Sequence, residues 1–393
     1  MGKKTTDRFA GESAWTAWRA FWWALYLATF IAVPIALHAH IKQTGSVAES
    51  LKFILPWIIF CLMLIGRMIV LFATRNMPRM ARKEATDGYL CILPWLVGFV
   101  SFTLGPMIFS IYIAMCDWDI INAPKFVGLA NFQQALFHDF RFIQALKVTI
   151  VYAMFALPLG LIGSLMVALL LNQKVRGMSW FRTIFYIPAI LPGVATAMVW
   201  KWIFNPENGI LNIFLSSKIW PWLHIGNGLS IQQIALVNTP PPWLADPKWA
   251  LPAFILMSLW GIGGGMIIYL AGLQGIPTQL YEAAEIDGAN PVQKFWKITL
   301  PMVSPTIFFN LVMGVIGSFQ VFTSSFVMTA GGPAYATLFY LLYLYQKAFQ
   351  YFQMGYAAAM AWILFVIILI CTLLVFKSSA GWVYYEGELK GRR

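Results

Sequence analysis

Eight long apolar runs, each close to the length that a helix needs to cross a bilayer, constrain the fold of this chain more than any other feature. A hydrocarbon core of about 30 Å requires roughly 20 apolar residues per helix. The runs are Phe21–Leu37, Phe53–Ala73, Tyr89–Ala114, Val148–Leu171, Thr183–Trp200, Trp249–Leu273, Met302–Val327 and Tyr356–Phe376. Charged residues make up only 11% of the 393 residues, about half the share in a soluble chain. We therefore predict an all-α fold, a polytopic membrane helix bundle with about eight transmembrane helices.

Two of the runs raise questions of their own. The first follows a cluster of lysine and arginine residues but has no clear cleavage site, which favours a retained signal-anchor helix over a cleaved signal peptide. The fifth contains Pro188 and Pro192. Neighbouring groups in a membrane protein satisfy the carbonyls that a proline leaves free, so we predict that the fifth run crosses the bilayer as one span.

The basic residues lie between the runs and are distributed unevenly. With the N-terminus inside, 18 of the 27 Lys and Arg residues fall in the inner segments and 9 in the outer segments. Because an excess of Lys and Arg marks the cytoplasmic side, we predict that both termini are cytoplasmic. The net charge of +12 thus reflects topology, since the basic residues form no continuous stripe with stacking aromatics that would bind nucleic acid.

The runs contain almost no ionisable side chains, which limits the energy source. Arg67, near the inner end of the second run, is the one Asp, Glu, Lys or Arg within the eight runs. Carriers driven by protons or sodium ions usually hold the coupling ion with a carboxylate or histidine inside the membrane. The sequence therefore disfavours an ion-coupled secondary carrier.

Catalytic and metal-binding motifs are missing from the sequence. No Gly-x-x-x-x-Gly-Lys-Ser/Thr phosphate loop occurs, so we expect ATP to be bound by a separate subunit. The four histidines lack the spacing of a zinc site. The cysteines lie in or beside apolar runs without a CxxC pair; they are Cys61, Cys91, Cys116 and Cys371. We predict that the chain holds no metal or cofactor and is not an enzyme.

The segment Ala271–Thr306, between the sixth and seventh runs, has the pattern of a helix–turn–helix at the cytoplasmic membrane surface. Good helix formers from Gln279 to Ile286 precede Gly288, and a glycine in this position ends a helix by taking a left-handed conformation. The predicted motif offers acidic and aromatic side chains to a cytoplasmic partner, namely Tyr281, Glu282, Glu285, Phe295 and Trp296. The alternative is an ordinary connecting loop.

A second short helix is predicted after this glycine. Asn290 and Pro291 suit a helix start, because the first supplies a capping side chain and the second a preset φ. We expect the helix to cover Val292–Ile298. Pro301 and Pro305 are then expected to lead the chain back into the bilayer.

The same segment resembles the EAA loop of binding-protein-dependent ABC importer permeases. The matching residues are Glu282, Ala283, Ala284, Asp287, Gly288, Ala289, Phe295, Ile298, Leu300, Pro301 and Pro305. Ala271-Gly272-Leu273-Gln274 and Ile276-Pro277 resemble the version found in the sugar (maltose-type) permeases. The resemblance implies that the loop at 274–301 sits in a cleft of a dimeric cytoplasmic ABC ATPase and couples ATP use to the membrane helices.

Resemblance to this family covers residues 89–377, which implies a six-helix permease core in a bacterial plasma (inner) membrane. Residues 1–88 are then an N-terminal extension with two extra helices and a basic linker, and residues 378–393 a cytoplasmic tail. The stretch 213–242 looks like an outer insertion. The implied partners are a second related permease, the ATPase dimer, an extracytoplasmic solute-binding protein and membrane lipid.

Within the family reading, we expect this chain to form half of a translocation pathway for a sugar or related polyol. Another polar solute such as glycerol phosphate is the alternative cargo. The candidate pathway residues are Trp260, Asn310, Gln320 and Phe322. The aromatic face of Trp260 is suited to stacking on a sugar, and Gln320 and Phe322 are expected to face a translocation cavity. Contact with lipid or with the protein core is the alternative for these residues. Helix–helix packing is the alternative role for the small residues around Asn310.

Overall fold

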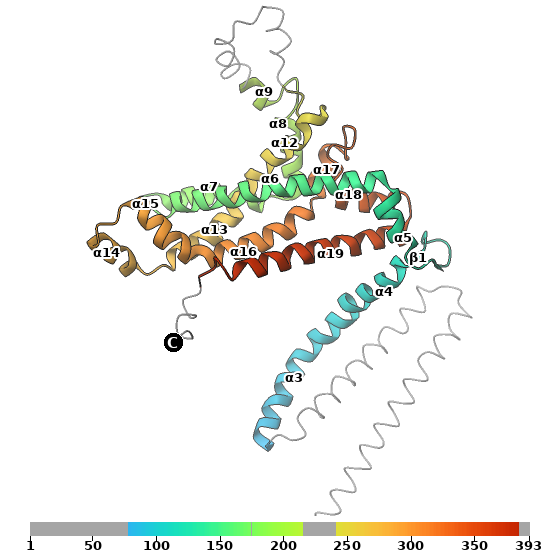
Figure 1. The fold of residues 1–393 in the computed structure, drawn as a ribbon, viewed down its shortest axis with the longest axis horizontal. Helices are drawn as coiled ribbons and strands as arrows, with labels where there is room; N and C mark the ends of the chain where they lie inside the picture. Colours follow the sequence, from blue (N-terminus) through green and yellow to red (C-terminus); the bar gives the residue numbers. More distant parts are fainter. Residues whose placement is uncertain (1–77, 174, 215–240, 385–393) are drawn as a thin grey trace, which may run out of the picture. The chain divides into compact units, whose positions relative to one another are not determined.

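The computed structural model describes residues 78–173, 175–214 and 241–384, which are overwhelmingly helical (Figure 1). The first two predicted runs and most of the predicted outer insertion lie outside the described residues. The chain divides into two compact units, one ending at Ser110 and the other beginning at Ile111. Each unit is considered separately below.

The described part of the first unit is one long helical stretch. It consists of α3 (Arg79–Phe99), a π-helical turn η1 (Val100–Leu104) and α4 (Gly105–Ala114), whose last residues belong to the second unit. Its portion Asp87–Ala114 is long and apolar enough to cross a membrane. The third predicted run is therefore confirmed as a candidate membrane helix.

The second unit is a helix bundle with one small ribbon, formed by the antiparallel strands β1 (Cys116–Asp117) and β2 (Lys125–Phe126). Its first helical elements are α5 (Ala130–Gln133), η2 (Gln134–His138), α6 (Phe140–Leu171), α7 (Met178–Ile190), α8 (Gly193–Ile203) and α9 (Ile210–Phe214). The later elements are α12 (Pro247–Ser258), η4 (Leu259–Gly261), α13 (Ile262–Gln274), α14 (Thr278–Ile286), α15 (Pro291–Lys294), η5 (Phe295–Thr299), α16 (Leu300–Phe319), α17 (Thr323–Met328), α18 (Tyr340–Tyr345), η6 (Gln346–Gln350) and α19 (Met354–Ser379).

Among the described residues, five helical stretches are long and apolar enough to span a membrane, or six if the bent pair α7–α8 counts as one. A polytopic helical fold is therefore confirmed. The helix α6 begins eight residues before the predicted run because Asp139 caps it, its carboxylate accepting from the backbone N–H of Arg141 at 2.9 Å and of Phe142 at 3.2 Å. Hydropathy alone does not detect this polar start.

The fifth predicted run, Thr183–Trp200, is not a single straight helix. The chain bends by 97° between α7 and α8. Leu191 is extended, with φ −62° and ψ 139°, and Pro192 follows it. Proline lacks an N–H and disfavours a helical conformation of the residue before it, so the break falls at this dipeptide. Pro188, by contrast, lies inside α7.

Three clusters of buried apolar side chains form the core of the second unit, and α13 packs against α6, α7 and α16. One glycine makes the contact with α7 possible. A Cβ added to Gly263 would collide with the backbone carbonyl of Phe185. The glycine-rich start of α13 therefore serves close packing of helix backbones, as small residues do in membrane proteins.

Asp139 also ties the start of α6 to α18 and α19. Its Oδ2 accepts from the hydroxyl of Tyr343 at 2.5 Å and from that of Tyr356 at 2.7 Å. Burial alone would raise the pKa of the Asp139 carboxyl, but these hydrogen bonds, the Phe142 N–H and the nearby charge of Lys347 hold that pKa below its ordinary value. The carboxylate is therefore charged at neutral pH and joins three helices at this end of the unit.

Candidate functional site

The turn between α14 and α15 is built from two standard helix-end motifs in immediate succession. Gly288 has φ +74° and donates to the Glu285 carbonyl at 3.0 Å, and Ala289 N–H donates to the Ala284 carbonyl at 2.8 Å. This pair of bonds is the Schellman motif, which satisfies the last carbonyls of a helix. Both alanines are half-buried at the turn. The predicted role of Gly288 is therefore confirmed.

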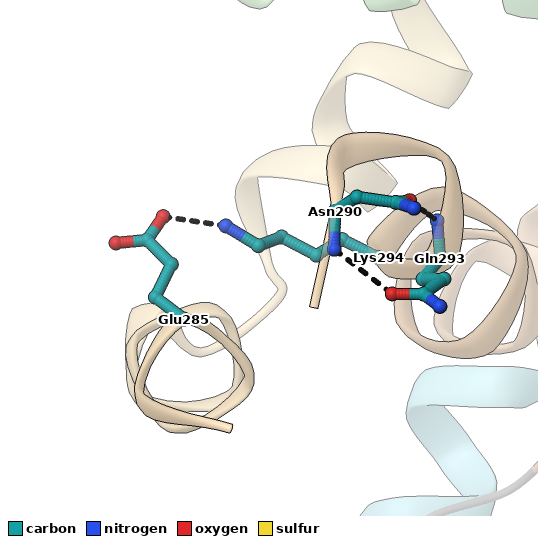
Figure 2. Close-up of polar contacts among 4 residues, drawn as sticks. All are labelled: Glu285, Asn290, Gln293 and Lys294. Atoms are coloured by element: carbon teal, nitrogen blue, oxygen red, sulfur yellow. Dashed lines mark hydrogen bonds and ion pairs between the residues drawn. The ribbon is translucent and has the colours of Figure 1, made fainter. Parts of the chain in front are cut away.

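Asn290 then starts the next helix at once. Its Oδ1 accepts from the backbone N–H of Gln293 at 2.8 Å, and Gln293 Oε1 accepts from the backbone N–H of Asn290 at 2.9 Å (Figure 2). This reciprocal pair is a capping box, and Pro291 occupies the first turn, where a missing N–H costs nothing. The predicted helix start is confirmed.

The expected end of this second helix is wrong. Instead of stopping near Ile298, the chain runs from α15 through the π-helical turn η5 directly into α16. Proline at 305 lacks the N–H that would bond to the Pro301 carbonyl, but the Ser304 hydroxyl donates to that carbonyl at 2.6 Å. The prolines therefore do not interrupt the helix that leads away from the surface.

We call α14, the turn and α15–η5 together the 278–299 hairpin. Its two limbs are joined by an ion pair between Lys294 Nζ and Glu285 Oε1 at 2.7 Å, shown in Figure 2, and by a 2.9 Å hydrogen bond between the hydroxyls of Tyr281 and Thr299. Tyr281 was expected to face a partner, but it is half-buried and packs against the core cluster that contains Leu273. The inner side of the hairpin is thus anchored to the bundle.

The outer side of the hairpin exposes apolar side chains next to acidic ones. Ile286 is 87% exposed, Val292 65% and Trp296 62%. Other exposed positions are Glu282, Ala283, Glu285, Asp287 and Gly288, whereas Ala284, Ala289, Phe295, Leu300 and Pro301 are half-buried. Large apolar side chains this exposed, next to carboxylates, are typical of an interaction surface. The sequence singled out Trp296 but missed Ile286 and Val292, although both flank the predicted turn.

A cavity of about 540 Å³ lies among α6, α12, η4, α13 and α16. Its polar lining residues are Tyr152, Ser164, Ser258, Tyr269, Asn310 and Ser318. The remaining described lining residues are alanine, glycine, leucine, isoleucine or methionine, so no charged side chain lines the cavity within the described part of the chain. Hydroxyl and amide groups in an otherwise apolar wall suit the recognition of an uncharged polar group.

The structure brings only Asn310, of the four predicted pathway residues, to this cavity. Its Nδ2 donates to the Thr306 carbonyl at 3.1 Å. Trp260 is 40% exposed and packs edge-on against Trp200, with ring centroids 5.6 Å apart. Phe322 stacks on Phe326 with ring centroids 5.4 Å apart.

Gln320, the fourth of them, caps the C-terminal end of α16 and is exposed. The other polar lining residues come from α6, α12, α13 and α16, so they meet only through the packing of those helices. The sequence feature that could have identified these lining residues is a single Tyr or Ser inside an otherwise apolar run. In the described part of the chain, no group of three or more His, Cys, Asp or Glu residues has the arrangement of a metal site.

Residues 160–380 match the family model described as the binding-protein-dependent transport system inner membrane component. The match covers more than half of the chain and includes the hairpin and most of the cavity. The chain belongs to this family. It is a permease subunit of an ABC importer, a membrane transport component and not an enzyme.

Curated relatives of this permease match it over nearly their full length. The probable ABC transporter permease protein YesP of Bacillus subtilis is 43% identical over 313 residues, which cover 79% of this chain and 96% of that protein. The sn-glycerol-3-phosphate transport system permease protein UgpA of Escherichia coli is 32% identical over 302 residues, covering 76% of this chain and 95% of that one.

Solved structures share the fold of this permease. A chain of a bacterial alginate ABC transporter, crystallised in complex with an alginate pentasaccharide-bound periplasmic protein, matches with a TM-score of 0.62 and 26% identity. The match covers 76% of this chain and 95% of that chain. A second structure, of a bacterial ABC transporter involved in alginate import, matches with a TM-score of 0.63 and 25% identity.

Proposed function

We propose that this permease forms half of a translocation pathway for a sugar or related polyol and is driven by a separate ATPase that docks on the 278–299 hairpin. The observation that carries the proposal is that one helix, α16, connects the hairpin to the cavity. The helix α16 begins at the hairpin and supplies Asn310, Gly314 and Ser318 to the cavity wall. A movement at the hairpin therefore has a direct path to the residues around the cavity.

Docking at the hairpin is supported by its exposed surface. Ile286, Val292 and Trp296 offer apolar area, and Glu282 and Asp287 offer negative charge around it. An apolar centre with a polar rim is the usual anatomy of a protein–protein contact. The partners in this proposal are a dimeric cytoplasmic ABC ATPase, which binds ATP, a second related permease and an extracytoplasmic binding protein.

The cavity supports a polyhydroxy cargo. Its polar groups are hydroxyls and amides, each able to donate or accept a hydrogen bond, and a sugar presents many partners of this kind. A phosphate or carboxylate would meet no opposite charge in the described lining of this cavity. The structural neighbours whose titles name alginate support a saccharide as the class of cargo, but not its neutrality, since alginate is an acidic polysaccharide.

A second candidate cargo is glycerol phosphate or another small polar anion. The likeness to the glycerol-3-phosphate permease of Escherichia coli, at 32% identity, favours it. Under this alternative the second permease would have to supply the cationic groups that bind the phosphate. The two cargo classes therefore differ in which subunit determines the recognition of charge.

Uptake into proteoliposomes that contain the complete importer tests both parts of the proposal. The vesicles are loaded with ATP and supplied with binding protein and a radiolabelled saccharide. We expect ATP-dependent uptake that unlabelled neutral oligosaccharides inhibit and glycerol 3-phosphate does not. Inhibition by glycerol 3-phosphate alone would show that the solute is glycerol phosphate and not a saccharide. Uptake without ATP would contradict the proposal that a separate ATPase drives transport.

A further inference from the structure

The two contacts between the limbs of the 278–299 hairpin differ in position. The Glu285–Lys294 ion pair, at 2.7 Å, lies beside the turn. The Tyr281–Thr299 hydrogen bond, at 2.9 Å, lies at the base, where η5 meets α16. Because one contact closes each end, the limbs are fixed relative to each other along the length of the hairpin.

The two limbs connect to the bundle in different ways. The limb α14 follows α13 after a non-helical break at Gly275–Pro277, whereas α15 and η5 continue into α16 without one. Without the cross-contacts, α14 would be held only by its packing and by the non-helical segments at its two ends. The Thr299 hydroxyl also reaches the Lys294 carbonyl at 3.4 Å, which closes the π-helical turn. Thr299 thus takes part both in the contact between the two limbs and in the π-helical turn that leads into α16.

The environment of the ion pair makes it more effective than a fully exposed one. The Lys294 side chain is 17% exposed and the Glu285 side chain 67%. Partial burial weakens screening by water and salt, so the attraction holds the lysine in place more firmly than at an open surface. A lysine left unpaired in this position would also lose a favourable charge contact.

We propose that Glu285–Lys294 and Tyr281–Thr299 are positioning pairs that make the hairpin and α16 move as one body. The inference rests on the proposed docking of an ATPase to the hairpin. From Thr299 to Asn310 the helix rises about 16 Å, so a tilt of the braced hairpin is carried to the cavity wall. The residues act by holding α14 against α15 and η5, which continue into α16, and they touch neither ATP nor solute.

Exchange of the two charges tests the ion pair. Glu285→Lys, Lys294→Glu and the double exchange are reconstituted in the complete importer, and solute transported per ATP hydrolysed is measured. We expect each single variant to lower this ratio about fivefold and the double exchange to restore it, since it returns an opposite pair to the same positions. Lys248→Glu, which reverses an exposed charge at the start of α12, is the matched control and keeps the ratio.

Tyr281→Phe and Thr299→Val test the second contact, because each removes one hydroxyl and keeps the shape. We expect both to lower the ratio, and the double variant to be no worse than either alone. Thermal stability of each purified variant separates a folding defect from loss of coupling. If all the single variants keep the wild-type ratio of solute transported to ATP hydrolysed while Ile286→Asp loses transport, the two pairs have no positioning role and the docking proposal still stands. A wild-type ratio in Ile286→Asp as well would remove the docking function itself.

Discussion

Gly288 shows how a single backbone angle defines the hairpin. Its φ is +74°, and a Cβ placed there would meet no atom within 4 Å, so space is not the reason for glycine. What a side chain would cost is conformational, about 1 kcal/mol for an ordinary residue in the left-handed region. The Asp-Gly-Ala sequence at 287–289 therefore has a physical meaning, because these three residues end α14 after Ile286 and lead directly to Asn290, the cap of the next helix.

Substitutions at Gly288 are predicted to follow backbone preference and not side-chain size. Asn tolerates the left-handed region better than Ala, a β-branched residue tolerates it poorly, and Pro excludes it. We expect ATP-coupled uptake to fall in the order Gly288→Asn, Gly288→Ala, Gly288→Val and Gly288→Pro, with the last inactive although still inserted in the membrane. Equal activity of the Asn and Pro variants would show that the turn does not matter.

Asn310 is the predicted pathway residue that the cavity contains. Asn310→Ala removes one amide, and the loss of one hydrogen bond to the solute is worth about 1 kcal/mol. We expect solute uptake at low concentration to fall by about fivefold while the ATPase activity of the assembly persists. Asn208→Ala, at an exposed turn before α9, is the control. Unchanged uptake in the Asn310 variant would remove this residue from the pathway.

Among the elements, hydropathy was a good guide to where membrane helices lie and a poor one to where they bend or begin. The break before α8 depends on the effect of Pro192 on the conformation of Leu191, whereas Pro188, four residues earlier, lies inside α7. Nothing in the sequence pattern distinguishes the proline that breaks the helix from the one that does not. Within α16, the Ser304 hydroxyl donates to the Pro301 carbonyl, which Pro305 leaves without its backbone donor. Such compensation is a property of particular side-chain rotamers and not of composition.

The candidate site also has some parts that the sequence predicts and others that it does not. The turn at Gly288 and the cap at Asn290 are local, so the sequence predicts both. The inward turn of Tyr281 toward Thr299 and the meeting of Ser164, Tyr269 and Asn310 around one cavity join distant parts of the chain. Those contacts depend on helix packing, which hydrophobic periodicity does not determine.

The packing of α13 on α7 gives a prediction at the scale of elements. Gly263→Ala would push a methyl group into the Phe185 carbonyl and force the helices apart, at a cost of about 1–3 kcal/mol. Gly261→Ala is the matched control, because no atom lies within 4 Å of its added Cβ and its φ is −86°. We expect thermal unfolding of the purified protein to shift down for Gly263→Ala and stay level or rise for Gly261→Ala. A similar loss in both would contradict the packing role.

At the scale of the whole molecule, this chain carries one 278–299 hairpin in its described part, while an ABC ATPase dimer has two-fold symmetry. The permease core therefore needs a second, related chain to complete both the docking and the pathway in the proposed assembly. The energy source lies outside the membrane on this account, which explains why the runs contain almost no ionisable residues.

Cross-linking at Ile286 tests the central claim, that the hairpin docks on a separate ATPase, most directly. A cysteine-free chain carrying Ile286→Cys is assembled into the complete importer and labelled with a maleimide–benzophenone reagent, which attaches to the cysteine and on illumination inserts into a C–H bond of whatever lies next to it. The account predicts a product that joins this chain to the ATPase subunit and is absent for Phe137→Cys, a position near Asp139 in the second unit that is 77% exposed against 87% for Ile286. No ATPase product from Ile286→Cys, or an equal yield from Phe137→Cys, would contradict it.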